Sequence, residues 1–130
     1  MLWNKSLEIG IPAIDLQHKE LFKQIDILSD VTQKDRVPQT LKFLEEYVRK
    51  HFNDEQAWHS RSNYPKAELH KKMHVGFVAA FEKMKHEYDS DPSNVAVLHK
   101  INKAVFDWLK THIMVHDKDF ATYYKTRQTQ

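Results

Sequence analysis

The chain contains no cysteine among its 130 residues. Disulfide bonds, thiolate metal sites and cysteine nucleophiles are therefore excluded, and any metal must be held by histidine and carboxylate side chains. Residues that break helices are also scarce, because the sequence has only 2 Gly and 4 Pro. This composition favours helices over strands and tight turns.

Long apolar runs and a strong net charge are missing as well. No stretch approaches the roughly 18 apolar residues that a transmembrane helix needs, and the first residues do not resemble a signal peptide. The formal net charge is +2, with acidic and basic residues interspersed along the chain. We therefore expect a cytoplasmic protein with neither a nucleic-acid nor a membrane partner.

Apolar residues recur at alternating steps of three and four in four segments, which is typical of amphipathic helices. Proline opens the first three segments, at the turn where its missing N–H costs nothing, and Ser93 or Asn94 can cap the fourth. The predicted fold class is all-α, an antiparallel up-down-up-down four-helix bundle. The expected helices span about residues 12–33, 38–61, 65–89 and 94–112.

The two ends of the chain add smaller elements to this bundle. Residues 1–11 carry large apolar side chains, including Trp3 and Ile9, which predict an N-terminal arm packed on the body. Aromatic residues within 120–124 predict a short C-terminal helix, and residues 126–130 predict a polar tail. The whole chain is expected to form a single domain, residues 1–130. No exposed apolar face is evident, so a monomer is expected.

Several histidines and one glutamate occupy core positions of the predicted helices. The segment HKKMH at residues 70–74 puts two histidines four apart, one turn above each other on the same helix face. In an up-down-up-down bundle, the starts of the first and third helices lie beside the ends of the second and fourth. All six residues then meet at one end of the core, and Asp117 lies just beyond them. The six are His18, His51, Glu55, His70, His74 and His112.

A single histidine on an apolar helix face is more often a hydrogen-bonded core residue than a metal ligand. Five histidines and a carboxylate meeting in one core would leave many buried polar groups without partners, and a bound metal removes that difficulty. Five imidazoles and two carboxylates exceed the positions of one octahedral ion, so two ions fit better. Nitrogen-rich sites with bridging carboxylates suit iron, while zinc is the inorganic alternative. A metal-free structural bundle remains the other alternative.

The spacing around Asp117 is unusual, because it follows His112 by five residues rather than four. If both side chains face inward, a bend or loop is expected near residues 113–117. His116 forms a second HxxxH pattern with His112 and could replace Asp117 in a zinc site. The four histidines outside the predicted cluster are expected to have surface or boundary roles: His59, His86, His99 and His116.

Taken together, these motifs resemble the hemerythrin family, in particular its single-domain bacterial members, the bacteriohemerythrins. The matching segments are IDLQH at 14–18, HFNDE at 51–55, HKKMH at 70–74 and HIMVHD at 112–117. Each segment is a weak signal alone, but the ordered set of four is specific. The resemblance spans nearly the whole chain and includes flanking residues such as Trp108.

The resemblance implies a non-heme di-iron centre with an oxo or hydroxo bridge and with O2 as its ligand. By the family pattern, three histidines bind one iron, two bind the other and leave a position for O2, and two carboxylates bridge the irons. The implied three-histidine set is His70, His74 and His112, the two-histidine set is His18 and His51, and the bridges are Glu55 and Asp117. Candidates for the apolar lining of the O2 pocket are Phe22, Phe52, Phe77 and Trp108.

The function implied is reversible O2 binding for storage, delivery or buffering, without catalytic turnover. A di-iron redox enzyme that scavenges peroxide or NO is one alternative, although di-iron oxidases of the ferritin-like class use more carboxylates. A module that senses O2 or iron is another alternative. The sequence does not indicate which protein would receive the O2.

Overall fold

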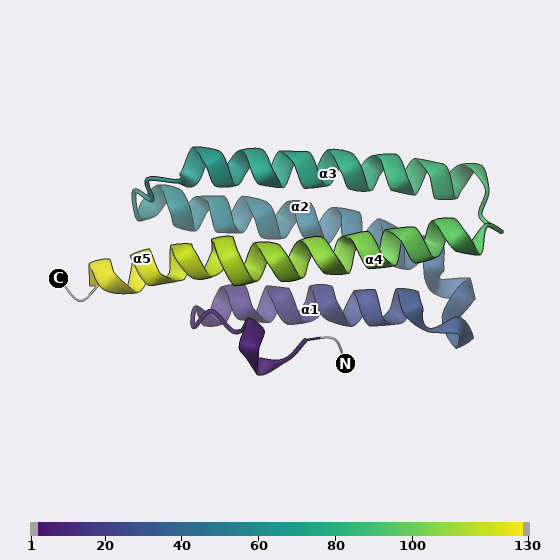
Figure 1. The fold of residues 1–130 in the computed structure, drawn as a ribbon, viewed down its shortest axis with the longest axis horizontal. Helices are drawn as coiled ribbons and strands as arrows, with labels where there is room; N and C mark the ends of the chain where they lie inside the picture. The colour runs from purple at the N-terminus through teal and green to yellow at the C-terminus, as the bar shows by residue number, and fades with distance from the viewer. Residues whose placement is uncertain (1–2, 129–130) are drawn as a thin grey trace.

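The computed structural model describes residues 3–128, apart from the side chains of residues 31–33 and 128. Four long helices lie side by side, and α1 and α3 each pack against both α2 and α4 (Figure 1). This arrangement is the predicted four-helix bundle. The long helices are α1 Pro12–Ser29, α2 Val37–Arg61, α3 Ala67–Ser90 and α4 Val95–His112.

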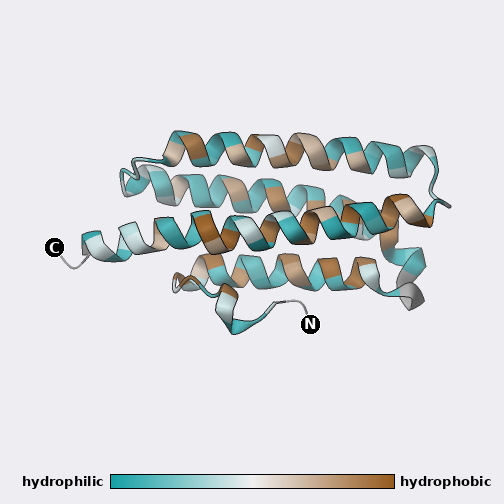
Figure 2. Cartoon of the chain, viewed as in Figure 1, coloured by the Kyte–Doolittle hydropathy of each residue, from teal (hydrophilic) through white to brown (hydrophobic). Residues whose placement is uncertain are grey.

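The core lies between the helices, where each contributes one apolar stripe. Leu21, Leu44, Phe81 and Val105 come from the four different helices and are all at most 3% exposed. Figure 2 shows apolar residues recurring among hydrophilic ones along the helices, as expected for a bundle with a solvated outer surface. Within residues 3–128, every helix is too short or too polar to span a membrane.

The helix starts follow the sequence signals closely. Pro38 lies in the first turn of α2, and the side chain of Asn94 caps α4 by accepting a hydrogen bond from the N–H of Ala96 at 3.0 Å. Helix α3 begins later than the predicted residue 65. The preceding Asn63 has a left-handed φ of 54°, and the turn that follows it takes up Pro65.

Helix α1 is shorter than predicted, because it ends at Ser29 instead of continuing to residue 33. Asp30 leaves the helical conformation with a ψ of 108°, and its N–H closes the last turn onto the carbonyl of Ile27. A 3₁₀ segment, η2 Val31–Arg36, then reverses the chain into α2. The apolar period alone did not indicate that the reversal would use these residues.

Helix α4 passes without a loop through a π-helical turn, η3 Ile113–Asp117, into the C-terminal helix α5 Lys118–Gln128. In Figure 1, α4 and α5 form one continuous rod that extends beyond the other helices. The sequence predicted a bend or loop near 113–117, and the structure has a π-helical turn there instead, so that prediction was wrong. The predicted tail is helical as far as Gln128, and residues 129–130 lie outside the described part.

The N-terminal arm packs on the bundle through Leu7, Ile9 and Ile11, all of which are buried. It contains a short 3₁₀ turn, η1 Lys5–Leu7. The buried carboxylate of Asp15 accepts hydrogen bonds from the N–H groups of Ile9 at 2.8 Å and Gly10 at 3.0 Å. Through these bonds Asp15 anchors the arm next to the start of α1, which carries His18.

Candidate metal centre

Seven buried polar side chains meet in the core at one end of the bundle. This is the end where α1 and α3 begin and α2 ends, at the left of Figure 1. None of the seven is more than 4% exposed. The structure thus brings together every residue that the sequence predicted as a metal ligand: His18, His51, Glu55, His70, His74, His112 and Asp117.

The seven side chains form two groups of possible ligand atoms that share Glu55. Within each group, the candidate atoms all lie within 4.8 Å of one another. The first group consists of Glu55, His70, His74 and His112, and the second of His18, His51, Glu55 and Asp117. One half of the site is therefore rich in imidazole, and the other half holds two imidazoles with both carboxylates.

Three imidazole nitrogens converge in the first group. The Nε2 atom of His112 lies 2.7 Å from Nε2 of His70 and 3.1 Å from Nε2 of His74. Nitrogens bound to one metal at about 2.1 Å and at right angles to each other are roughly 3 Å apart. This convergence fits three nitrogens on one face of an octahedral ion.

Each carboxylate extends across both halves of the site. For Glu55, Oε1 lies 2.8 Å from Nε2 of His70, whereas Oε2 lies 3.4 Å from Nε2 of His51. For Asp117, Oδ1 lies 3.1 Å from Nε2 of His70, whereas Oδ2 lies 3.2 Å from Nε2 of His18. The two oxygens of each carboxylate thus approach different histidines, as a bridge between two ions requires.

Several buried atoms of the site have no hydrogen-bond partner within the described chain. They include both oxygens of Glu55, both oxygens of Asp117 and both ring nitrogens of His18. Buried polar groups without partners are rare and costly in proteins. Two bound cations would use these lone pairs and balance the carboxylate charge, so the donor set fits a pair of metal ions.

The electrostatics of the site indicate the same need for cations. Burial and the neighbouring charge of Asp117 raise the pKa of Glu55 well above its usual value. Burial also disfavours ionised Asp117, but the nearby imidazoles of His112, His18 and His70 outweigh burial and hold its pKa well below the usual value. Two carboxylates this close resist ionising together unless a cation lies between them.

The histidines respond differently to the same surroundings. Burial lowers the pKa of His51 to about 3, and the adjacent His18 contributes to this lowering. Burial opposes the charged form of His70 as well, but Asp117 and Glu55 raise its pKa to about 9. Burial also lowers the pKa of His74 and of His112, so these two and His51 are held in the neutral form, which is the form that binds a metal.

A second layer of polar residues orients some of these histidines. Gln17 Oε1 lies 2.7 Å from Nδ1 of His51, and Gln17 Nε2 donates to Oδ2 of Asp54 at 2.8 Å. The amide of Gln56 lies 3.3 Å from Nδ1 of His74. Such partners fix the ring so that Nε2 faces the site. Our sequence interpretation missed these residues, although Gln17 is adjacent to His18.

Aromatic rings pack around the three-histidine half. Phe52 stacks on His74 with ring centroids 3.7 Å apart, and Trp108 stacks on His112 at 4.3 Å. Phe77 in turn stacks on Trp108 at 4.3 Å. The fourth predicted pocket residue, Phe22, is fully buried one turn after His18 and packs edge-on against Phe106. These rings give the site an apolar surround.

The prediction of a surface or boundary role for His59 was wrong. Its side chain is 1% exposed, packs against His70, Tyr64 and Phe120, and has no hydrogen-bond partner for either ring nitrogen within the described residues. The continuation of α5 brings Phe120 over the end of α2 and so covers His59. His59 belongs to neither ligand group.

The three remaining histidines lie where the sequence predicted. His86 and His99 are exposed, and His116 is partly buried. The ring centroid of His116 is 5.4 Å from that of His112, but His116 is in neither group of ligand atoms. The π turn instead directs Asp117 into the site, because the extra residue in the turn brings positions 112 and 117 to the same face.

Comparison with known proteins gives a consistent family assignment. The family model described as "Hemerythrin HHE cation binding domain" matches residues 9–124. The chain is 28% identical to a bacteriohemerythrin of Clostridium acetobutylicum, over 92% of this chain and 97% of that protein. It is 35% identical to hemerythrin subunit alpha of Lingula anatina, over 88% and 87%, and 29% identical to myohemerythrin of Theromyzon tessulatum, over 85% and 82%.

Proposed function

The chain belongs to the hemerythrin family, and on this premise we propose that it stores, delivers or buffers O2. Its buried histidine and carboxylate cluster, together with the family match, indicates a non-heme di-iron centre that binds O2 reversibly. Proteins of this family are mainly O2 carriers, and the proposed role of this chain is likewise carriage without turnover.

We assign the ligands by the two halves of the cluster. In this proposal His70, His74 and His112 hold one iron, and His18 and His51 hold the other. Glu55 and Asp117 would each bind both irons, and this assignment is supported above all by the approach of their paired oxygens to different histidines. The half with fewer imidazoles offers fewer protein donors and would therefore leave room for O2. Zinc is disfavoured, because five imidazoles and two bridging carboxylates would make nine bonds, whereas two tetrahedral ions offer eight positions.

When bound, the two irons supply the redox electrons and the open coordination position that O2 binding requires. The protein residues keep this chemistry reversible. Gln17 accepts the Nδ1–H of His51 and thereby holds the Nε2 lone pair toward the site. Phe52 and Trp108 cover the imidazoles and exclude water, which would otherwise promote irreversible oxidation.

A monomeric state and a cytoplasmic location are parts of this proposal. The exposed apolar side chains are spread over several helices, among them Leu16 on α1, Val75 on α3 and Val95 on α4. Sedimentation tests the oligomeric state and cell fractionation tests the location. Sustained consumption of peroxide or NO by the iron-loaded protein would instead favour the enzyme alternative.

The ligand assignment is tested by counting metal ions after reconstitution. The wild-type chain is expected to hold two irons, whereas Glu55→Ala is expected to hold fewer than one, because the variant loses a ligand to both ions. His86→Ala, which changes an exposed histidine outside the cluster, is the matched control and should hold two irons. Full iron loading of Glu55→Ala would contradict the assigned bridging role.

A further inference from the structure

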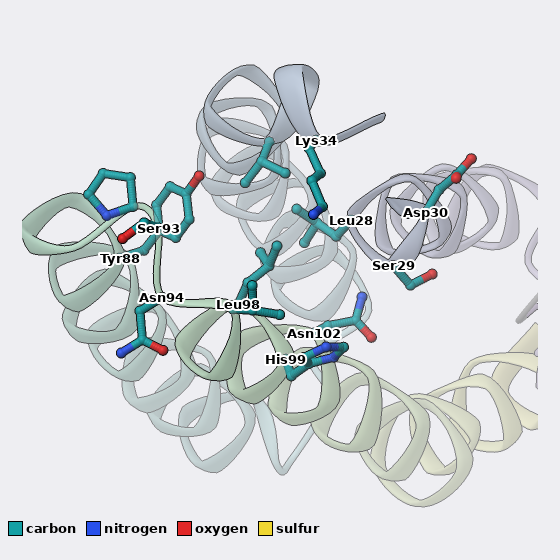
Figure 3. A pocket seen from close by; sticks show the side chains of 13 residues that line it. Leu28, Ser29, Asp30, Lys34, Tyr88, Ser93, Asn94, Leu98, His99 and Asn102 are labelled. Carbon is teal, nitrogen blue, oxygen red and sulfur yellow. The ribbon is translucent and has the colours of Figure 1, made fainter. Parts of the chain in front are cut away.

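A cavity of about 230 Å³ lies at the end of the bundle opposite the candidate metal centre (Figure 3). It is formed by the end of α1, segment η2, the first residue of α2, the end of α3 with the turn that follows it, and the start of α4. Tyr88 in its wall follows the metal-centre residue His74 by 14 positions on α3, which is about 21 Å along a helix. The cavity is therefore separate from the di-iron site.

The cavity has an apolar floor. Leu28 and Val37 are at most 4% exposed, and Leu98 is partly buried among them. Val95 adds a half-exposed apolar side chain at the rim. A cavity of about 150 Å³ with such a lining can hold benzene. The larger volume here accommodates a ring or short alkyl chain together with one small polar group.

Tyr88 supplies a hydroxyl in this wall. Its side chain is 7% exposed, and its hydroxyl has no hydrogen-bond partner among the described residues. Burial and the charge of Asp89 raise the pKa of Tyr88 above its usual value, so the hydroxyl stays protonated and able to donate. The hydroxyl oxygen is not fully buried, so water can reach it, and a bound acceptor in the cavity would replace that water as its hydrogen-bond partner.

Lys34 supplies a positive charge at the same cavity. In Figure 3, Lys34 and Tyr88 reach in from different sides, and the carboxylate of Asp30 points away. Lys34 makes no ion pair within the described residues. The N-terminus of α4, capped by Asn94, also lines the cavity, and the first turn of a helix adds partial positive charge.

We propose that this cavity binds a small monocarboxylate with an apolar body, of the size of benzoate. The carboxylate accepts a hydrogen bond from the Tyr88 hydroxyl and pairs with the Lys34 ammonium, while the apolar body lies against Leu28, Val37 and Leu98. One cation above an apolar floor matches one negative charge on an apolar molecule. A fully hydrated anion such as inorganic phosphate has no apolar surface to bury against this floor.

The test is a titration of the iron-loaded full chain with 4-fluorobenzoate, followed by ¹⁹F NMR of the ligand. Saturable binding to one site is expected, with fluorobenzene and inorganic phosphate binding much more weakly. Because a carboxylate can also coordinate iron, the visible spectrum of the metal centre is recorded at every step and is expected to stay unchanged. A spectral change at saturation would assign the binding to the metal centre and overturn the proposal.

Variants of the two polar residues locate the site. Tyr88→Phe and Lys34→Gln are each expected to weaken binding about tenfold, as for loss of one hydrogen bond to a charged group. Lys83→Gln changes an exposed lysine that does not line the cavity, and is expected to bind like wild type. Equal affinity in all four proteins, no saturable binding, or equally tight binding of fluorobenzene would each overturn the proposal.

The stability of Tyr88→Phe separates a binding role from a structural one. Because the hydroxyl has no partner among the described residues, its removal is expected to leave the thermal midpoint without ligand unchanged or slightly raised. The added ligand is expected to raise the midpoint of the wild type and not that of the variant. A lowered midpoint in the variant without ligand would show that the hydroxyl serves the fold and would contradict the proposal.

Discussion

At the scale of single residues, the metal centre combines groups that would be unfavourable in any other core. Both oxygens of Glu55 and of Asp117 are buried without hydrogen-bond partners in the described chain. The sequence was sufficient to select these residues, because ligand-type side chains interrupt apolar stripes at one end of a predictable bundle. It was not sufficient to predict that Gln17 is the hydrogen-bond partner of His51 or that His59 is buried, because both outcomes depend on which helices face each other.

Replacing Gln17 by leucine tests the hydrogen bond behind His51. The variant keeps the size of the side chain but removes the acceptor of the Nδ1–H group, so the imidazole loses its fixed orientation. Loss of such an outer partner typically weakens metal binding about 10- to 100-fold. We expect iron to transfer to a competing chelator at correspondingly lower chelator concentration.

The matched control for that experiment is Gln24→Leu on the same helix. Gln24 is also partly buried, but its side-chain amide donates to Glu20 within α1. Iron retention in this variant should equal that of the wild type. If Gln17→Leu also retains iron like the wild type, the hydrogen bond to His51 has no role in metal binding.

Replacing His59 by methionine tests its buried and unpartnered ring. Burial, reinforced by the nearby His70, lowers the pKa of His59 to about 4, below the value near 6.5 in an unfolded chain. Between these pH values the His59 imidazole is protonated in the unfolded chain but neutral in the folded chain. The free energy of unfolding therefore falls as the pH drops from 6.5 toward 4. By pH 5 this costs about 1–2 kcal/mol.

We therefore expect metal-free His59→Met to lose less stability than the wild type between pH 7 and pH 5, as measured by urea unfolding. The variant should still load two irons, because His59 is in neither ligand group. His86→Met is the exposed control and should follow the wild type. Loss of iron in His59→Met would mean that the ligand set on α2 is misassigned.

At the scale of secondary-structure elements, the site depends on where each helix starts and on how α4 continues. Proline positions and the Asn94 cap made most helix starts predictable within one or two residues. The residue at which α1 ends could not be predicted from the sequence, nor could the π-helical conformation of residues 113–117. A five-residue spacing between two inward-facing side chains can be met by a loop, a kink or a π turn, and the choice depends on the packing of α5.

The two glycines test the structural account of the arm and of α3. Gly10 has a left-handed φ of +85°, and a Cβ there would also displace the end of the Lys125 side chain, so Gly10→Ala is expected to destabilise the protein by about 1–2 kcal/mol. Gly76 lies inside α3, and a Cβ added there would meet no other side chain within 4 Å. Gly76→Ala should therefore stabilise the protein by about 0.5–1 kcal/mol.

Urea unfolding of the metal-free proteins measures both effects, and each variant serves as the control for the other. The same substitution should change the free energy of unfolding in opposite directions at the two positions. A stabilising Gly10→Ala would mean that Gly10 does not adopt the left-handed conformation on which the packing of the arm depends.

At the scale of the whole molecule, the bundle separates two sites at opposite ends of one apolar core. The metal centre gathers residues from all four long helices and the π turn, so two bound ions would link the four long helices to one another. The other end contains the cavity below Lys34 and Tyr88. The sequence predicted the bundle and one polar end, but a cavity formed by several segments that are distant in the sequence cannot be recognised from periodicity.

The central claim is that this bundle binds O2 reversibly at a di-iron centre. Its most direct test is the visible spectrum of the ferrous protein, recorded while the gas phase is cycled between nitrogen and oxygen. We expect a charge-transfer band that appears under oxygen, disappears under nitrogen and returns with the same intensity over repeated cycles. A band that forms once and does not reverse, or no band in a protein with two irons per chain, would contradict the account.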